Sequence, residues 1–197
     1  NPDVSSCRGV SSGERQGVSL GERRSAELTL ALEQQTAIHK ALDEVGKTFA
    51  SREVLESVDG VGLLQASSLL VYAFGDRVPE HRDAAGIALG ACPVFRGSGT
   101  KASGAAKGKA RMRKSVPARA RKTTYLLGLL ATLNMRWAKA MYADHIRRGK
   151  EPANCYRCIA RSLLRILSAM VRNQVPYDED RYIAALKKNG VSWAMEL

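Results

Sequence analysis

Apolar residues recur every three or four positions along most of this chain, and this spacing is the strongest constraint on its fold. Between Tyr125 and Ile146 the recurring residues are Leu126, Leu130, Leu133, Trp137 and Met141. Between Ala153 and Val171 they are Ile159, Leu163, Ile166 and Met170, and Pro176 closes the segment. A period of about 3.6 residues places such side chains on one face of an α-helix. No segment shows the alternation that is typical of strands, so we expect an all-α fold.

Composition and periodicity divide the chain into four parts. Residues 1–25 are rich in Ser, Gly and Arg, and we expect them to be disordered or the remnant of a missing segment. Residues 26–50 carry a heptad seam, which predicts a coiled-coil-type helix that pairs with another helix or packs back on its own domain. Residues 51–180 are expected to form a compact helical domain, and residues 181–197 a C-terminal tail.

Glycines mark the ends of two short helices in this part of the chain. A helix expected over 80–89 ends at Gly90, and one over 180–188 ends at Gly190, because glycine readily adopts the left-handed conformation that ends a helix. Residues 94–118 have almost no apolar side chains and are expected to be irregular.

Two glycines also shape the segment that precedes the first of these helices. Gly60 and Gly62 suit a tight turn between two helices, and Val58 and Val61 bracket the turn with apolar contacts. The small residues Gly62 and Ala66 would also let the helices approach closely. This is the pattern of a helix-hairpin-helix, whose second helix can hold a DNA phosphate with its first backbone N–H groups. An ordinary αα-hairpin explains the segment equally well, but the basic residues that follow favour DNA.

The positive charge of the chain is concentrated in one stretch. Residues 84–143 contain twelve Lys or Arg and no Asp or Glu, while the formal net charge of the whole chain is +12. The rest of the chain is therefore balanced. A surface of one sign attracts a polyanion, and nucleic acid is the most common one. The stretch therefore indicates a protein that binds DNA or RNA.

A glycine-rich loop lies inside this acid-free stretch. Ser98 stands between Gly97 and Gly99, so its hydroxyl is a candidate nucleophile towards a phosphate. The basic residues that would stabilise the developing charge are Arg96, Lys101, Lys107, Lys109, Arg111, Arg113 and Lys114. Composition alone favours the simpler interpretation of a solvated loop that grips nucleic acid without a covalent step. Ser103 and Ser115 lie in the same basic run and are not excluded as nucleophiles.

A second basic group follows the predicted helix that ends at Ile146. It contains Arg147 and Lys150, and then Arg157, Arg161 and Arg165, which are spaced by four residues and share one helical face. Like charges at this spacing destabilise an isolated helix, so we expect them to face an anion. A solvated polar face is the alternative.

The sequence offers no metal site of its own. Cys155 and Cys158 have the spacing of half a zinc site or of a redox pair, but no second pair completes a zinc site, so we expect thiols without a chemical role. No carboxylates converge near Ser98. We therefore expect no cofactor in this chain. The absence of a long apolar run and of a signal region predicts a cytoplasmic protein that does not enter a membrane.

Seven short motifs occur in one order along the chain. They are Leu55-x-x-Val58-x-Gly60-Val61-Gly62, Ala88-Leu89-Gly90-x-x-Pro93, Ser98-Gly99-Thr100, a basic run into Tyr125-Leu126, Tyr142 through Arg147-x-Gly149-Lys150, Ala160-Arg161-x-Leu163-Leu164 and Pro176-Tyr177-Asp178. In this order they resemble the C-terminal domain of the IS-one-ten type of insertion-sequence transposases, a group that includes the Piv DNA invertases. The resemblance covers roughly residues 54–180.

This resemblance implies a recombinase guided by a structured bridge RNA. The C-terminal domain of such proteins supplies a serine nucleophile that becomes covalently linked to DNA, and the matching residue here is Ser98. Their Mg²⁺ is held by a RuvC-like domain that this sequence does not contain, so the chain alone is expected to be inactive. The implied partners are DNA, the guide RNA and further copies of the chain in a dimer or tetramer.

Two alternatives remain open. A truncated or decayed transposase would act as a non-catalytic helix-hairpin-helix module that binds DNA or RNA. An RNA-associated structural protein, such as a basic protein of the ribosome, is a weaker alternative, because the apolar helices after Tyr125 are typical of an independent domain.

Overall fold

The computed structural model describes residues 20–75, 80–95, 110–113 and 115–197. The chain divides into two compact units, Asn1–Ile38 and His39–Leu197. The described part of the first unit is a single helical segment, the beginning of α1 (Leu20–Gly46). The helix begins at Leu20 rather than at residue 26, and it ends at Gly46 rather than at residue 50.

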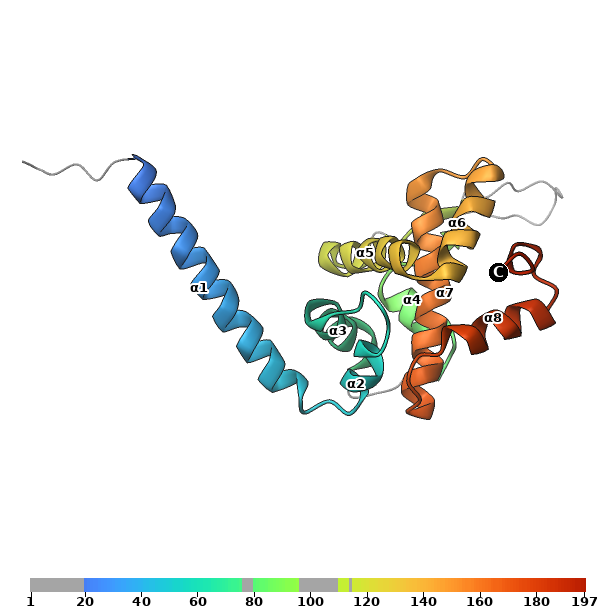
Figure 1. The fold of residues 1–197 in the computed structure, drawn as a ribbon, viewed down its shortest axis with the longest axis horizontal. Coiled ribbons are helices and arrows are strands. Elements are labelled where there is room, and N and C mark those ends of the chain that lie inside the picture. Colours follow the sequence, from blue (N-terminus) through green and yellow to red (C-terminus); the bar gives the residue numbers. More distant parts are fainter. Residues whose placement is uncertain (1–19, 76–79, 96–109, 114) are drawn as a thin grey trace, which may run out of the picture. The chain divides into compact units, whose positions relative to one another are not determined.

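The second unit is a helical domain, as the apolar spacing predicts, and Figure 1 shows its arrangement. After the end of α1, its elements are α2 (Ser51–Glu56), α3 (Leu63–Leu69), a π-helical turn (Leu70–Phe74), α4 (Ala84–Ala88), β1 (Pro93–Phe95), β2 (Ala110–Met112), α5 (Ala118–Asn134), α6 (Arg136–Arg147), α7 (Pro152–Asn173), α8 (Glu179–Lys188) and a 3-10 turn (Ser192–Ala194). Among the described residues, no helix is both long and apolar enough to cross a bilayer.

The helix α7 lies at the centre of this domain and packs against α2, α4, α5 and α6. Pro152 opens it, where the missing N–H of proline costs nothing. Its buried side chains include Ile159, Leu163 and Leu167, which recur every four residues. The helix expected over 153–171 is therefore confirmed.

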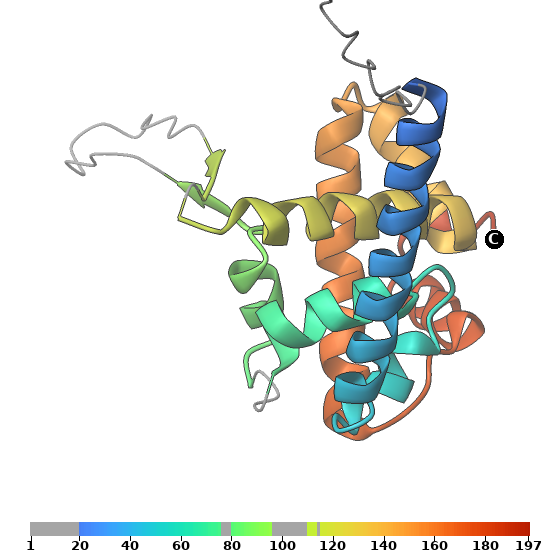
Figure 2. The same ribbon diagram turned by 90° about the vertical axis from the view of Figure 1, so that its left-hand side faces the viewer.

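The helix α5 crosses α7 (Figure 2) and touches it through small side chains. The expected contact stripe is wrong here, because Leu133 is 60% exposed. The buried face instead contains Ala120, Leu127, Gly128 and Ala131. Small residues let the two helix axes come close together, which outweighs the burial of larger side chains on the other face.

The single helix expected over 125–146 is also wrong, because the chain breaks into α5 and α6 at Met135. Met135 has an extended backbone, with φ −103° and ψ 135°. The carboxylate of Glu179 accepts hydrogen bonds from the backbone N–H groups of Arg136, at 2.6 Å, and Trp137, at 3.3 Å. A side chain from α8 thus caps the start of α6, and this tertiary contact stabilises the break.

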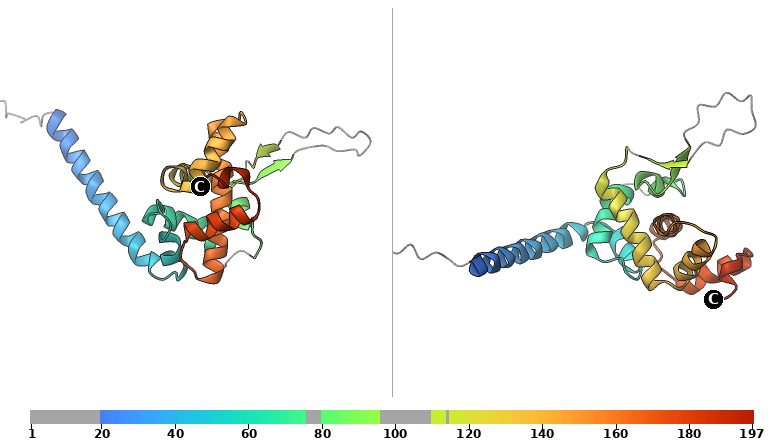
Figure 3. Two further views of the ribbon diagram at one scale, coloured as in Figure 1. Left: turned by 45° about the vertical axis from the view of Figure 1, so that its right-hand side comes forward. Right: turned by 90° about the horizontal axis from the view of Figure 1, so that it is seen from above.

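Two short strands contradict the expectation of a chain without strands (Figure 3). β1 and β2 pair antiparallel, with Val94 opposite Arg111 and Phe95 opposite Ala110. Each strand has three residues, which is too short for an alternating pattern to be recognised in the sequence.

The predicted helical hairpin is present as α2, a turn and α3. Gly60 adopts φ +86° in the turn, and both Val58 and Val61 are buried. Of the two small residues expected at the crossing, Ala66 is buried. The expectation is wrong for Gly62, because a Cβ built there would meet no atom within 4 Å.

Two other boundaries change. The helix expected over 80–89 is limited to α4, with Gly90 following it at φ +73°. The segment 181–197 is part of the domain rather than a tail, because Ile183 and Ala194 are buried in it.

Candidate nucleic-acid interface

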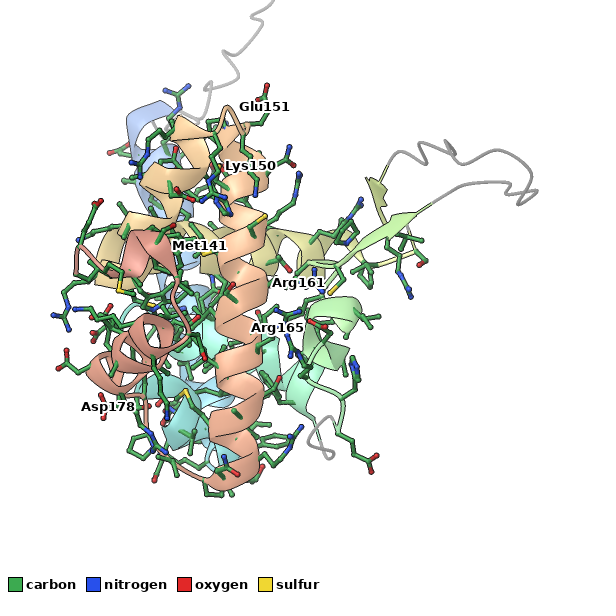
Figure 4. The ribbon with its side chains drawn as sticks, turned by 90° about the vertical axis from the view of Figure 1, so that its right-hand side faces the viewer. Met141, Lys150, Glu151, Arg161, Arg165 and Asp178 are labelled. Atoms are coloured by element: carbon green, nitrogen blue, oxygen red, sulfur yellow. The ribbon has the colours of Figure 1, made fainter. Side chains whose placement is uncertain are left out.

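The polar face of α7 carries a row of three arginines, Arg157, Arg161 and Arg165. They are four residues apart, which corresponds to about 6 Å along a helix. All three are partly exposed, while the opposite face of α7 lies in the core. In Figure 4, Arg161 and Arg165 extend from α7 towards α4, and Lys150 lies near the beginning of α7. The name basic row is used below for Arg157, Arg161 and Arg165.

Asp83, immediately before α4, joins two members of this row. Its carboxylate accepts hydrogen bonds from Nε of Arg165 at 2.7 Å, Nη2 of Arg165 at 3.1 Å and Nε of Arg161 at 3.3 Å. The guanidinium of Arg165, followed by that of Arg161, holds the pKa of Asp83 far below its ordinary value, although burial acts in the opposite direction. Two arginines share one carboxylate, so Arg161, Arg165 and Asp83 together retain a net positive charge.

The acid-free stretch contributes to the same place. Burial raises the pKa of the Cys92 thiol, and the positive charges of Arg161, Arg165 and Arg113 oppose this rise. Arg113, which is exposed, therefore lies within electrostatic range of the thiol together with the two arginines of α7. Arg113 and Arg161, which the sequence placed in separate motifs, thus both act electrostatically on Cys92.

A second basic group surrounds the turn between α6 and α7. The buried carboxylate of Asp144 lies 2.9 Å from Nε of Arg148 and 3.7 Å from Nη2 of Arg147, and both arginine side chains are largely exposed. Lys150 is exposed as well. One acid thus orients two of the three cations towards solvent.

His145 lies beside this second group but adds no charge to it at neutral pH. Burial is the main cause that lowers the pKa of His145, and the positive charge of Lys150 lowers it further. Its Nδ1 atom, which lies 3.9 Å from Oδ2 of Asp144, has no hydrogen-bond partner among the described residues.

Most of the predicted loop lies outside the residues that the structure describes. Ser98 lies outside the described residues, as do Arg96, Lys101, Lys107, Lys109 and Lys114. Arg111 lies on β2, and its side chain is not described. The pairing of β1 with β2 does bring together the two chain positions between which residues 96–109 run, because Phe95 is the partner of Ala110.

The predicted turn of the helical hairpin has acidic rather than basic neighbours. Gly60 and Gly62 are both exposed, and the exposed Asp59 precedes them. Arg52 is the only Lys or Arg over residues 48–74, and it forms ion pairs with Asp43 and Glu56. Over the described residues 48–74, the turn therefore has no Lys or Arg that is free of an acidic partner.

Three further basic residues were not among the predicted binding residues. Arg119, Arg121 and Lys122 are exposed in the first turns of α5. The absence of acid from residues 84–143 was the signal that could have found them.

The described residues contain no group of three or more His, Cys, Asp or Glu side chains that could hold a metal ion. Cys92, Cys155 and Cys158 are free thiols, and Cys155 is buried. Among described groups, the clearest chemistry of this surface is the binding of an extended anion by clustered guanidinium groups.

Comparison with known proteins adds no relative. No model of a protein family matches the chain, and no curated protein does.

Proposed function

We propose that this chain is the nucleic-acid-binding and strand-exchange domain of a DNA transposase or site-specific recombinase of the IS-one-ten type. It binds DNA and a structured guide RNA, and Ser98 is its nucleophile. The observation that carries the binding part is the pair of arginines on α7, Arg161 and Arg165, which share the single carboxylate of Asp83. Arg113 of the acid-free stretch supports it, because its positive charge acts with theirs on the Cys92 thiol.

The charge of this surface suits a phosphate backbone. The positions of the basic row repeat at about 6 Å along α7, so neighbouring guanidinium groups can contact successive phosphates. Arginine also offers paired N–H donors that match phosphate oxygens. Contacts of this kind position a nucleic acid without reading its sequence, which agrees with a domain whose target is chosen by a guide RNA.

Binding is tested by its dependence on salt. The logarithm of the association constant for a duplex should fall linearly with the logarithm of salt concentration, by about 0.9 for each phosphate contact. The double variant Arg113→Ser with Arg161→Ser should flatten this slope, whereas Lys188→Ser on α8 should leave it unchanged. If the slope is the same in the unmodified chain, the double variant and Lys188→Ser, the proposed interface is wrong.

Catalysis is tested by trapping a covalent adduct between DNA and the full-length recombinase that the proposal implies. Ser98→Ala should abolish the adduct, while Ser103→Ala in the same basic run should retain it. An adduct that survives Ser98→Ala excludes Ser98 as the nucleophile. If Ser98→Ala leaves every activity unchanged, the chain is a non-catalytic binding module.

A further inference from the structure

A groove of about 680 Å³ lies between the second half of α7 and α8. Its α7 side includes Ile166 and Met170, and its α8 side includes Tyr182 and Ala185. Val175, in the connection between the two helices, also lines it. The volume lies within the range of small-molecule sites in proteins. The groove is not part of the surface around Asp83, but Arg165 belongs to both.

Two tyrosines on the wall of the groove are held firmly from the core side. The hydroxyl of Tyr177 accepts a hydrogen bond from Nε1 of the buried Trp137 at 2.8 Å. The ring of Tyr182 meets that of Trp137 edge to face, with centroids 5.1 Å apart. Burial raises the pKa of both tyrosines, so both are neutral at physiological pH. The wall is therefore an aromatic surface in a fixed position, which reduces the entropy lost when a planar ligand stacks on it.

The groove is also lined by polar and basic side chains, of which Arg165 is paired with Asp83 outside the groove. Arg165 and Arg181 line it, and Asp178 is the only acid among the lining residues. The Asp178 carboxylate is already engaged, because it accepts the backbone N–H of Arg181 at the start of α8. Asn173 adds an amide that can both donate and accept hydrogen bonds. An apolar aromatic wall together with basic side chains suits a ligand that joins a flat ring to an anion.

We propose that this groove receives one unpaired base of a nucleic acid whose backbone follows the basic row. Arg165, which ends the row and lines the groove, would contact the phosphate next to that base. A base inside a duplex is stacked on both faces and cannot enter, so the groove selects an unpaired or flipped-out nucleotide. The inference rests on the proposed function and adds a site for a single nucleotide to it.

The test fills the groove without touching the basic row. Ala185 is exposed and lines the groove, whereas the neighbouring Ala184 is exposed and does not line it. Ala185→Trp should therefore block a base, and Ala184→Trp is the matched control. The probes are a fluorescent DNA duplex, the same duplex with one unpaired adenine in its centre, and an RNA duplex with the same unpaired adenine.

We expect Ala185→Trp to weaken binding of the probes with an unpaired base by about tenfold, within the usual contribution of base stacking on an aromatic side chain. Binding of the fully paired duplex should not change, and Ala184→Trp should bind all probes like the unmodified chain. A loss confined to the DNA or to the RNA probe would identify the nucleic acid that supplies the base.

Equal binding of paired and unpaired probes by the unmodified chain, or equal affinities of the two tryptophan variants, would overturn the inference. So would a change of oligomeric state in Ala185→Trp alone, measured by sedimentation, because the groove would then be an interface between copies. The proposed function is judged separately by the salt dependence of the Arg113 and Arg161 variants. It survives a negative result at the groove.

Discussion

Gly128 is a residue at which α5 lies very close to the backbone of α7. A Cβ built on it would lie 2.7 Å from the carbonyl carbon and 3.0 Å from the Cα of Tyr156. Both are backbone atoms of α7, which cannot move aside like the end of a flexible side chain. The crossing of the two helices therefore depends on the missing side chain.

We predict that Gly128→Ala lowers the free energy of unfolding by about 3 kcal/mol, although alanine has the higher helix propensity. Urea denaturation followed by circular dichroism measures this change. Gly62→Ala is the control, because Gly62 has a negative φ and free space, and it should cost less than about 1 kcal/mol. If Gly128→Ala and Gly62→Ala lower the free energy of unfolding equally, α5 and α7 do not approach closely at Gly128.

Asp83 is the second residue whose replacement should affect stability, because its carboxylate binds both Arg161 and Arg165. Its folded pKa is lowered, mainly by Arg165. The unfolded chain therefore binds more protons at acid pH than the folded chain. The stabilisation from this carboxylate is present at neutral pH and is lost as pH falls below about 4.

We predict that Asp83→Asn destabilises the domain by about 1–2 kcal/mol at pH 7. The difference from the unmodified chain should shrink as pH is lowered from about 4 towards 2. Denaturation at a series of pH values measures both effects. Asp59→Asn, at an exposed residue with no ion pair among the described residues, is the control and should change the free energy of unfolding by less than about 0.5 kcal/mol at pH 7. A difference that stays constant with pH would mean that Asp83 acts by packing alone.

At the scale of elements, the break between α5 and α6 is the main departure from the helices that the sequence pattern predicts. Neither proline nor glycine stands between Leu129 and Ile146, and the apolar residues continue across the break at helical spacing. A local sequence pattern therefore predicts one helix. The break is stabilised by Glu179, which is 43 residues away from Arg136 along the chain.

We predict that Glu179→Ala lowers the free energy of unfolding by about 1–2 kcal/mol, because two backbone N–H groups lose their acceptor. The adjacent Asp180→Ala is the control. Asp180 is largely exposed and binds only the side chain of Arg136, so its removal should cost less than about 0.5 kcal/mol. Thermal and urea denaturation compare the free energies of unfolding of the two variants. A larger loss for Asp180→Ala would mean that the ion pair with Arg136, and not the capping of α6, stabilises the break.

The two strands are the other elements that the sequence did not reveal. Their pairing involves residues on both sides of a long basic segment, and each strand is too short to show a period. The pairing also matters for the proposed site, because Phe95 and Ala110, which flank the segment that contains Ser98, are partners.

At the scale of the whole molecule, the core lies within one of the two units. All buried apolar residues of the described chain fall between Val54 and Ala194, within the unit that starts at His39. The end of α1 belongs to this unit and contributes Asp43, whose carboxylate pairs with Arg52. Phe49 packs against the core.

We predict that a chain that starts at His39 unfolds with the same free energy as the full chain. A chain that starts at Ser51 loses the contacts of Asp43 and Phe49 and should be less stable by about 2 kcal/mol. Denaturation of the three proteins tests this prediction. A loss of stability on removal of residues 1–38 alone would show that the domain extends into the first unit.

The sequence by itself determined the helical class, most helix positions in the second unit and the concentration of charge, because each depends on residues close together in the chain. The spacing of apolar residues is enough to predict α7, Gly190 marks the end of α8, and the turn at Gly60 follows from its neighbours. The tertiary structure alone decided which cations meet and where a helix breaks. Asp83 pairs with Arg161 and Arg165 at separations of 78 and 82 residues. Such contacts arise only when the core brings α4 against α7, and no local pattern encodes them.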